Sequence, residues 1–140
     1  MGRSYWFECP KCAYRADVSG RADRGVSFCV QTILCRDCKE LFDAVSQVKV
    51  PDQPLAQGLL AGLRPAKSSN LFRSLKVAPS FQSVLNRLPP AGVKRFRWLA
   101  FKVQCPAFPW HRIENWNAPD RCPKCGTCLE QSVLPFRIWD

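Results

Sequence analysis

The chain has 140 residues, a formal net charge of +10 and nine cysteines. Its length allows one domain or two very small ones, and it has no apolar run of the ~20 residues that a membrane-spanning helix requires. The first residues lack the apolar segment of a secretory signal, so we expect a cytoplasmic protein with reduced thiols. Reduced cysteines at C-x-x-C spacing favour metal binding over disulfide formation.

The first segment, residues 1–50, is predicted to be mostly β-strand. It carries a net charge of +2 and contains two C-x-x-C pairs, "CPKC" at 9–12 and "CRDC" at 35–38. Short runs of β-branched and aromatic residues next to these pairs are typical of strands. We expect strands at 4–8, 26–34 and 41–50.

The two pairs have the spacing of a four-cysteine metal site. One C-x-x-C turn presents two sulfurs to one ion, and zinc takes four such ligands in a tetrahedron. The 22 residues between the pairs are enough for a hairpin that brings the two turns together. The sequence therefore predicts a first zinc site, with the ligands Cys9, Cys12, Cys35 and Cys38.

The pattern C-x2-C-x22-C-x2-C resembles the zinc ribbon family, in which two cysteine turns, or knuckles, hold one structural zinc beside a small antiparallel sheet. The resemblance covers roughly residues 5–50 and implies that the N-terminal domain, 1–50, is a zinc ribbon. The chain departs from the family pattern at Ala13, where glycine is usual, and at "CRDCK", which has neither the proline nor the glycine of a typical knuckle.

The middle segment, residues 51–92, is predicted to be a basic linker. It contains six prolines and no cysteine, and residues 51–100 carry a net charge of +7. Apolar residues at helical spacing favour a short helix at 80–88, with Ser80 as its N-cap, and a second one at 54–63. We expect both helices to pack on the metal domains rather than to dock on a membrane.

The last segment, residues 93–140, is predicted to be a second ribbon-like module that begins with a strand at 93–104. A second "CPKC" at 122–125 follows Cys105 and His111, the only histidine in the chain. The predicted ligands of the second zinc site are therefore Cys105, His111, Cys122 and Cys125. Cys128 in place of His111 or Cys105 is the alternative.

Cys29 and Cys128 are left over from the two sites. Cys29 lies in an apolar strand, and we expect it to be a small buried hydrophobic residue. Cys128 is expected to be a free thiol unless it replaces a ligand. The whole pattern predicts a small, mostly-β, zinc-stabilised protein, in which two antiparallel zinc-ribbon-like modules are joined by a proline-rich linker with short helices.

The predicted sites indicate a non-enzymatic protein with no small-molecule substrate. Four protein ligands close a zinc site and leave no position for water or substrate. The sequence has no convincing Ser-His-Asp set, no H-E-x-x-H motif and no glycine-rich phosphate loop. A redox protein resembling rubredoxin, with iron in place of zinc, is the least favoured alternative, because the predicted second site contains a histidine and the knuckle at 35–38 departs from the usual pattern.

A short basic and aromatic stretch favours a nucleic-acid or nucleoprotein partner. In "KRFRW", Lys94, Arg95 and Arg97 alternate with Phe96 and Trp98, so that charge can meet phosphates and Trp98 can stack on a base. One alternative is that Phe96 and Trp98 form a buried face while the basic residues are merely solvated. Another is a protein–protein adaptor or a subunit of a larger assembly.

Overall fold

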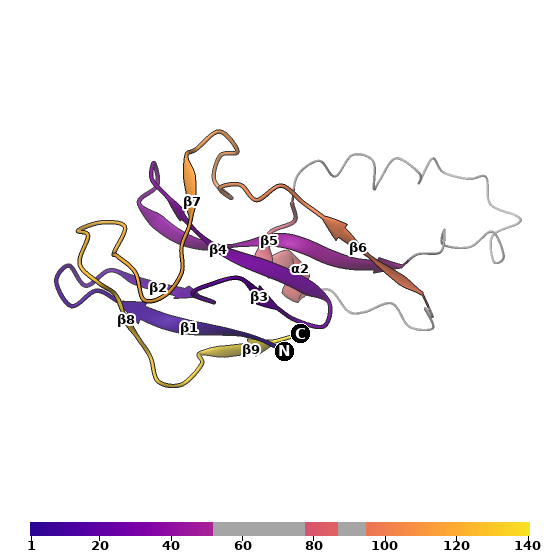
Figure 1. The fold of residues 1–140 in the computed structure, drawn as a ribbon, viewed down its shortest axis with the longest axis horizontal. Helices are drawn as coiled ribbons and strands as arrows, with labels where there is room; N and C mark the ends of the chain where they lie inside the picture. The colour runs from indigo at the N-terminus through magenta and orange to yellow at the C-terminus, as the bar shows by residue number, and fades with distance from the viewer. Residues whose placement is uncertain (52–77, 87–94) are drawn as a thin grey trace, which may run out of the picture.

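The computed structural model describes residues 1–51, 78–86 and 95–140 (Figure 1). Most of the regular structure in these residues is antiparallel strand, arranged in two sheets with one short helix. The mostly-β fold class predicted from the sequence is confirmed. No helix in the described ranges is long and apolar enough to cross a membrane. Most of the predicted linker, including the helix expected at 54–63, lies outside the described residues.

The first sheet is built around β1, the strand at the amino terminus. On one side β1 pairs with β2, and on the other side it pairs with β8 and β9, all antiparallel. Phe7 of β1 is buried, as is Val18 of β2, so one face of this sheet contributes to the core. The bounds are Gly2–Glu8 for β1, Arg15–Val18 for β2, Glu130–Gln131 for β8 and Arg137–Trp139 for β9.

The second sheet has the strand order β3-β4-β5-β6, and β7 also pairs with β4. Its centre is the hairpin of β4 and β5, whose register shifts between Cys29 and Val30. The strands predicted at 26–34 and 41–50 correspond to β4 and β5. Of the strand predicted at 93–104, the described residues 95–104 contain β6. The bounds are Asp23–Arg24 for β3, Phe28–Cys35 for β4, Glu40–Pro51 for β5, Phe96–Ala100 for β6 and Ile113–Asn115 for β7.

The helix α2, Phe81–Leu85, begins where the sequence predicts. The hydroxyl of Ser80 accepts a hydrogen bond from the N–H of Ser83 at 3.2 Å, which is the N-cap interaction expected of a serine. Val84 is buried against the second sheet, with Phe81 and Leu85 beside it. The helix therefore packs on the β-structure, as expected for this stretch.

The two ends of the chain do not form separate modules. β8 and β9 from the C-terminal segment pair with β1, and β6 and β7 pair with β5 and β4. Each sheet thus contains strands from both ends of the chain, and the two termini lie side by side (Figure 1). The sheets do not follow the predicted division into a ribbon at 1–50 and a second module at 93–140. The physical reason is that backbone pairing between the two ends joins them in both sheets.

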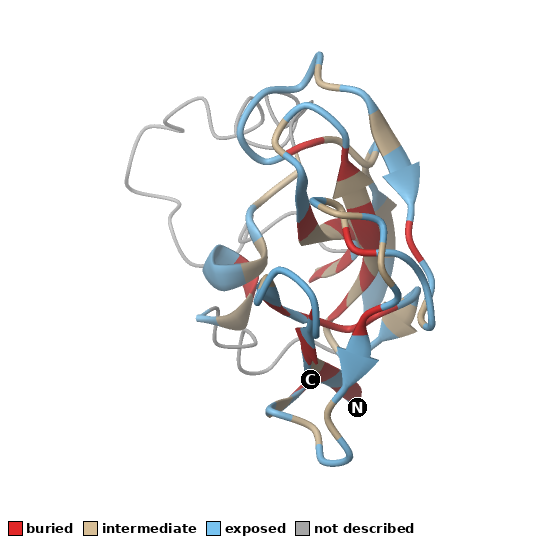
Figure 2. Ribbon diagram, turned by 90° about the vertical axis from the view of Figure 1, so that its left-hand side faces the viewer, coloured by how far each residue is buried: buried red, intermediate tan, exposed pale blue. Residues whose placement is uncertain are grey.

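Two apolar clusters form the core. Figure 2 shows buried residues in red inside the described part of the chain. In the first, the rings of Phe7 and Trp116 are nearly perpendicular, with ring centroids 5.1 Å apart. In the second, Phe28 of β4 stacks on Trp139 of β9 at 4.4 Å. Trp139 comes from the last strand of the chain, so this cluster also depends on both ends of the sequence.

A buried polar network lies between β2 and the β4–β5 hairpin. One carboxylate oxygen of Asp43 accepts a hydrogen bond from the Thr32 hydroxyl at 2.7 Å. The other accepts from the N–H and the hydroxyl of Ser19 at 2.8 and 2.9 Å. Burial raises the pKa of Asp43 to about 6, although these three donors favour the ionised form.

Candidate metal centres

Three knuckles share one backbone geometry. In each, the residue after the second cysteine donates its N–H to the carbonyl oxygen of the first cysteine, at 2.9–3.0 Å. That residue has a left-handed backbone, with φ of 58° at Ala13, 55° at Lys39 and 76° at Gly126. Glycine adopts this conformation readily, whereas a residue with a Cβ atom pays about 1–2 kcal/mol for it. The knuckles of Ala13 and Lys39 form without glycine, so the departures from the ribbon pattern do not prevent the turn.

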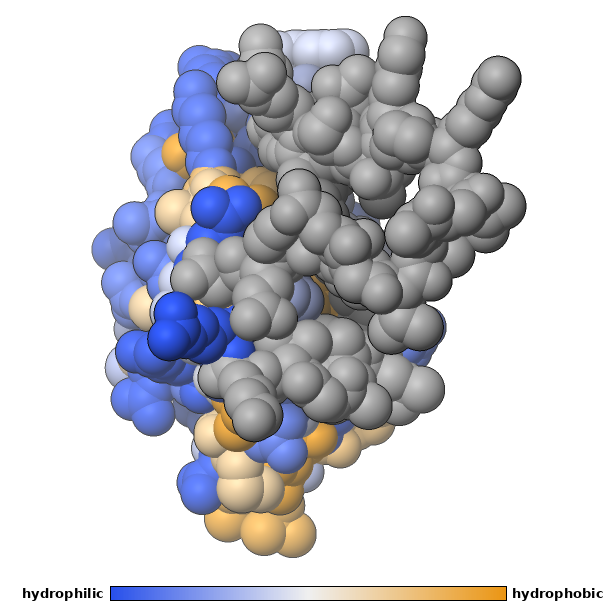
Figure 3. All heavy atoms as spheres, turned by 90° about the vertical axis from the view of Figure 1, so that its right-hand side faces the viewer, coloured by the Kyte–Doolittle hydropathy of each residue, from blue (hydrophilic) through white to orange (hydrophobic). Residues whose placement is uncertain are grey.

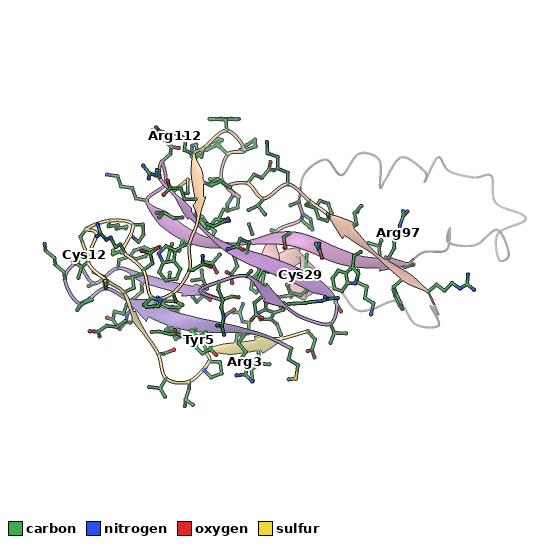
Figure 4. All side chains as sticks on the ribbon, in the orientation of Figure 1. Arg3, Tyr5, Cys12, Cys29, Arg97 and Arg112 are labelled. Atoms are coloured by element: carbon green, nitrogen blue, oxygen red, sulfur yellow. The ribbon has the colours of Figure 1, made fainter. Side chains whose placement is uncertain are left out.

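The first cluster, centre A, joins the knuckle after β1 to the knuckle before β8. The Sγ atoms of Cys9 and Cys125 are 3.3 Å apart, and those of Cys12 and Cys122 are 3.6 Å apart. Cys9 and Cys122 are buried, whereas Cys12 lies at the surface, at one end of the molecule (Figure 4). Centre A consists of Cys9, Cys12, Cys122 and Cys125, whose sulfurs all lie within 4.8 Å of one another.

The second cluster, centre B, joins the β4–β5 turn to the loop between β6 and β7. Nδ1 of His111 lies 3.6 Å from Cys35 Sγ, 3.3 Å from Cys38 Sγ and 3.6 Å from Cys105 Sγ. The Sγ atoms of Cys38 and Cys105 are 3.7 Å apart. Centre B consists of Cys35, Cys38, Cys105 and His111, also within 4.8 Å of one another.

These distances match a tetrahedral metal site. Four sulfurs held about 2.3 Å from a zinc ion lie about 3.8 Å from one another, and a sulfur and an imidazole nitrogen about 3.6 Å. The separations given above for the two centres run from 3.3 to 3.7 Å. All four donor atoms of each centre lie within 4.8 Å of one another, close enough to share one ion. The two groups are consistent with two metal ions.

Backbone N–H groups point at the sulfurs, as they do toward thiolates. Cys38 donates to Cys35 Sγ at 3.3 Å, and Lys124 donates to Cys122 Sγ at 3.4 Å. The side chain and the N–H of Thr127 lower the pKa of Cys125 to about 6. Burial opposes ionisation of Cys105, but backbone N–H groups and the His111 ring lower its pKa to about 7. One thiol of each centre, Cys125 in centre A and Cys105 in centre B, thus has a lowered pKa.

The eight ligands named from the sequence are the eight residues of the two centres, but the predicted pairing of the knuckles differs from the structure. Cys9 and Cys12 face Cys122 and Cys125, not Cys35 and Cys38. Cys35 and Cys38 instead face Cys105 and His111. The cause is strand pairing: β8 lies against β1, and β7 against β4, so each N-terminal knuckle meets a C-terminal partner.

The two leftover cysteines lie outside both centres. Cys128 is exposed, and its backbone forms an isolated β-bridge with Arg121. It belongs to neither centre and so replaces neither His111 nor Cys105. Cys29 is half-buried rather than fully buried, and its Sγ lies 3.8 Å from Oε1 of Gln47. The expectation of a buried Cys29 is wrong because the alternation of β4 turns this side chain to the outer face of the sheet.

The basic and aromatic stretch lies on β6, at the far end of the molecule from Cys12 (Figure 4). Phe96 is exposed and Trp98 half-buried on the outer face, while Leu99 packs on the second core cluster. The alternative in which Phe96 and Trp98 form a buried face is therefore wrong for Phe96. Arg95 and Arg97 are exposed, and Lys94 lies outside the described residues.

Two cations on this face were missed by the sequence interpretation. The guanidinium of Arg24 lies over the Trp98 ring at 4.8 Å, and Nζ of Lys49 lies over the Phe96 ring at 4.9 Å. Lys49 pairs with Trp98 across β5 and β6, so their side chains share one face. The alternation of the predicted strand 41–50 could have suggested an outward Lys49, but nothing in the sequence placed Arg24 near β6.

Comparison of the chain with protein-family models, curated proteins and solved structures finds no match, so the two centres and the outer face of β6 are the features from which its function is inferred.

Proposed function

We propose that centres A and B each hold one structural zinc ion and that the protein is a non-enzymatic, nucleic-acid-associated binding module. Thiolate and imidazole donors in a tetrahedral arrangement suit zinc, and the single histidine of centre B disfavours a rubredoxin-like iron site. Four protein ligands per ion leave no open position for a substrate. Both ions cross-link N-terminal and C-terminal segments, so zinc contributes directly to folding.

The observation that carries the nucleic-acid proposal is the alternation of cations and aromatic rings on the outer face of β5 and β6. Arg24 and Lys49 lie on the Trp98 and Phe96 rings, and Arg95 extends the positive charge past the start of β6. Phosphates bind such cations, and aromatic rings of this kind stack on unpaired bases. Asp23 lies beside Arg24 and adds one acidic side chain to this region.

A shallow depression adjoins this face and supplies polar groups. It has a volume of about 580 Å³ and is open to solvent. The amides of Gln31, Gln47 and Asn115 line it beside Arg24. Amide groups donate and accept hydrogen bonds at base edges. A strand of nucleic acid along β6 would thus meet charge, ring faces and amides on one surface.

Arg97 and Trp98 do not share a face. Arg97 is opposite Val50 in the β5–β6 register, whereas Trp98 is opposite Lys49. Successive residues of a strand point to opposite sides of the sheet. Arg24 and Lys49 should therefore contribute more to binding than Arg97 does, which sharpens the prediction made from "KRFRW".

The test is a salt titration of the zinc-loaded protein with mixed-sequence single-stranded RNA or DNA. About four neutralised phosphates predict a slope of log K against log salt of about −3. The double substitution Arg24→Gln and Lys49→Gln should flatten the slope by about one to two units. The matched control, Lys11→Gln with Lys124→Gln, removes the same charge from the knuckles of centre A and should leave the slope nearly unchanged.

Two results would contradict the proposal. Absence of measurable affinity at ~50 mM salt would exclude nucleic-acid binding, because the electrostatic contribution is large at low salt. Equal effects of the test and control substitutions would mean that binding follows net charge rather than the β6 face. In either case the competing adaptor function, in which the partner is a protein, would be favoured.

A further inference from the structure

Three apolar side chains of the connection between β8 and β9 are exposed, beside the exposed Trp6 of β1. Val133 is 95% exposed and Leu134 is 76% exposed. Phe136 packs on Trp6 of β1, with ring centroids 4.6 Å apart, and both rings are also exposed. Figure 3 shows hydrophobic residues gathered at the bottom of the molecule, the end where Figure 1 places this connection. We call Trp6, Val133, Leu134 and Phe136 the apolar cluster.

The connection is held to the sheet by hydrogen bonds at both ends. Ser132 and Trp6 bond in both directions, from Ser132 N–H to the Trp6 carbonyl at 2.8 Å and from Trp6 N–H to the Ser132 hydroxyl at 3.2 Å. The Ser132 hydroxyl donates to the Leu134 carbonyl at 2.8 Å, and Phe136 N–H donates to the Ser4 carbonyl at 2.8 Å. A surface fixed in this way loses little conformational entropy when it binds.

Opposite charges flank the apolar cluster. The guanidinium of Arg137 lies over the Phe136 ring at 5.4 Å. On the other side, Glu130 is directly opposite Glu8 in the β1–β8 register, and Glu8 shares a face of β1 with Trp6. Glu8 pairs with Arg15, whereas neither Glu130 nor Arg137 has an ion pair with another residue in the described ranges. The surface is therefore positive at one end, apolar in the middle and negative at the other.

A surface of this kind is complementary to itself. A two-fold axis through Leu134 reverses the direction of the second copy, which sets Arg137 of each copy toward Glu130 of the other. In this arrangement the second copy covers Val133 and Leu134. Their exposure to water in the monomer is unfavourable in free energy. We propose that the protein forms a two-fold symmetric homodimer through the apolar cluster, with Glu130 and Arg137 pairing between copies.

The first test measures the mass of the zinc-loaded protein by sedimentation over a range of concentrations. The chain mass of 15.9 kDa should double to about 32 kDa as concentration rises. Val133→Asp and Leu134→Asp should each raise the dimer dissociation constant by at least about 100-fold, because each lost contact occurs twice. Val26→Asp, which changes an exposed valine outside the apolar cluster, is the matched control and should leave the mass unchanged.

The second test fixes the orientation of the two copies. Glu130→Arg alone and Arg137→Glu alone should each weaken the dimer by about fivefold, because like charges then face each other. Both substitutions in one chain should restore it, since the reversed pair is again complementary. Failure of the double variant to recover would overturn the proposed two-fold arrangement.

Two outcomes would overturn the proposal as a whole. One is a mass of 15.9 kDa at every concentration that the protein reaches in solution. The other is a dimer that Val133→Asp and Leu134→Asp leave intact, which would place the interface elsewhere. In the first case, capture of a different protein only when Leu134 is present would assign the apolar cluster to that partner instead. The salt titration with nucleic acid is unaffected by any of these results, because β6 lies on the other sheet.

Discussion

Substitution of Gly126 by alanine isolates the cost of the left-handed residue that ends each knuckle. Gly126 has φ of 76°, and a Cβ atom added there would meet nothing within 4 Å. Only the backbone conformation is therefore penalised. We expect Gly126→Ala to lower the free energy of unfolding by about 1 kcal/mol. Ala13→Gly, the reverse change in the partner knuckle of centre A, should raise it by about 0.5–1 kcal/mol.

Gly20 supplies the contrasting case, in which both the backbone and the packing oppose a side chain. It has φ of 80°, and an added Cβ would lie 2.6 Å from Cζ of Phe7, which is buried in the first core cluster. Gly20→Ala should therefore cost about 2–4 kcal/mol, the sum of the backbone and overpacking contributions.

Urea unfolding measures all three variants, with free zinc held constant because bound metal adds to apparent stability. If the slope of the unfolding free energy against urea concentration is unchanged, each variant unfolds in the same way as the wild type. A loss for Gly126→Ala as large as that for Gly20→Ala, or a loss for Ala13→Gly, would refute the shared left-handed geometry of the knuckles.

Three further predictions concern the metal centres, the polar network and the core. Cys122→Ser should release one of two bound zinc ions, whereas Cys128→Ser should keep both, as measured by elemental analysis. Burial raises the pKa of Asp43 to about 6, so protonation of Asp43 stabilises the fold below about pH 4 and this stabilisation disappears as pH rises through about 6. The stability of the wild type relative to Asp43→Asn should therefore fall by up to about 3 kcal/mol between those limits in urea unfolding. Trp139→Ala removes the ring stacked on Phe28 and should cost about 3–5 kcal/mol, while Trp110→Ala, at an exposed ring, should cost little in the same measurement.

The ligands of both centres were predictable because cysteine spacing reflects local geometry. A C-x-x-C turn presents two sulfurs whatever the rest of the chain does, and His111 is the only histidine available. The left-handed residue of a knuckle was predictable at Gly126, where glycine marks it. Ala13 and Lys39 also have a left-handed backbone, although neither is a glycine. In both turns this residue donates its N–H to the carbonyl oxygen of the first cysteine.

The pairing of the knuckles was not predictable because it depends on short strands far apart in the sequence. β8 has two residues and β7 has three, too few for a periodic pattern. Yet these strands decide that Cys122 meets Cys9 and that His111 meets Cys35. The nearest partner along the chain was the natural choice for each knuckle, and long-range pairing overrode it. The outer position of Arg24 beside Trp98 was hidden for the same reason.

Crossed pairing of the knuckles is the central structural claim, and cadmium NMR tests it most directly. Cadmium replaces zinc at thiolate sites, and through-bond coupling connects each cadmium nucleus to the Hβ protons of its own cysteines. The structure predicts that one cadmium correlates with Cys9, Cys12, Cys122 and Cys125, and the other with Cys35, Cys38 and Cys105. One cadmium coupled to Cys9, Cys12, Cys35 and Cys38 together would contradict the account.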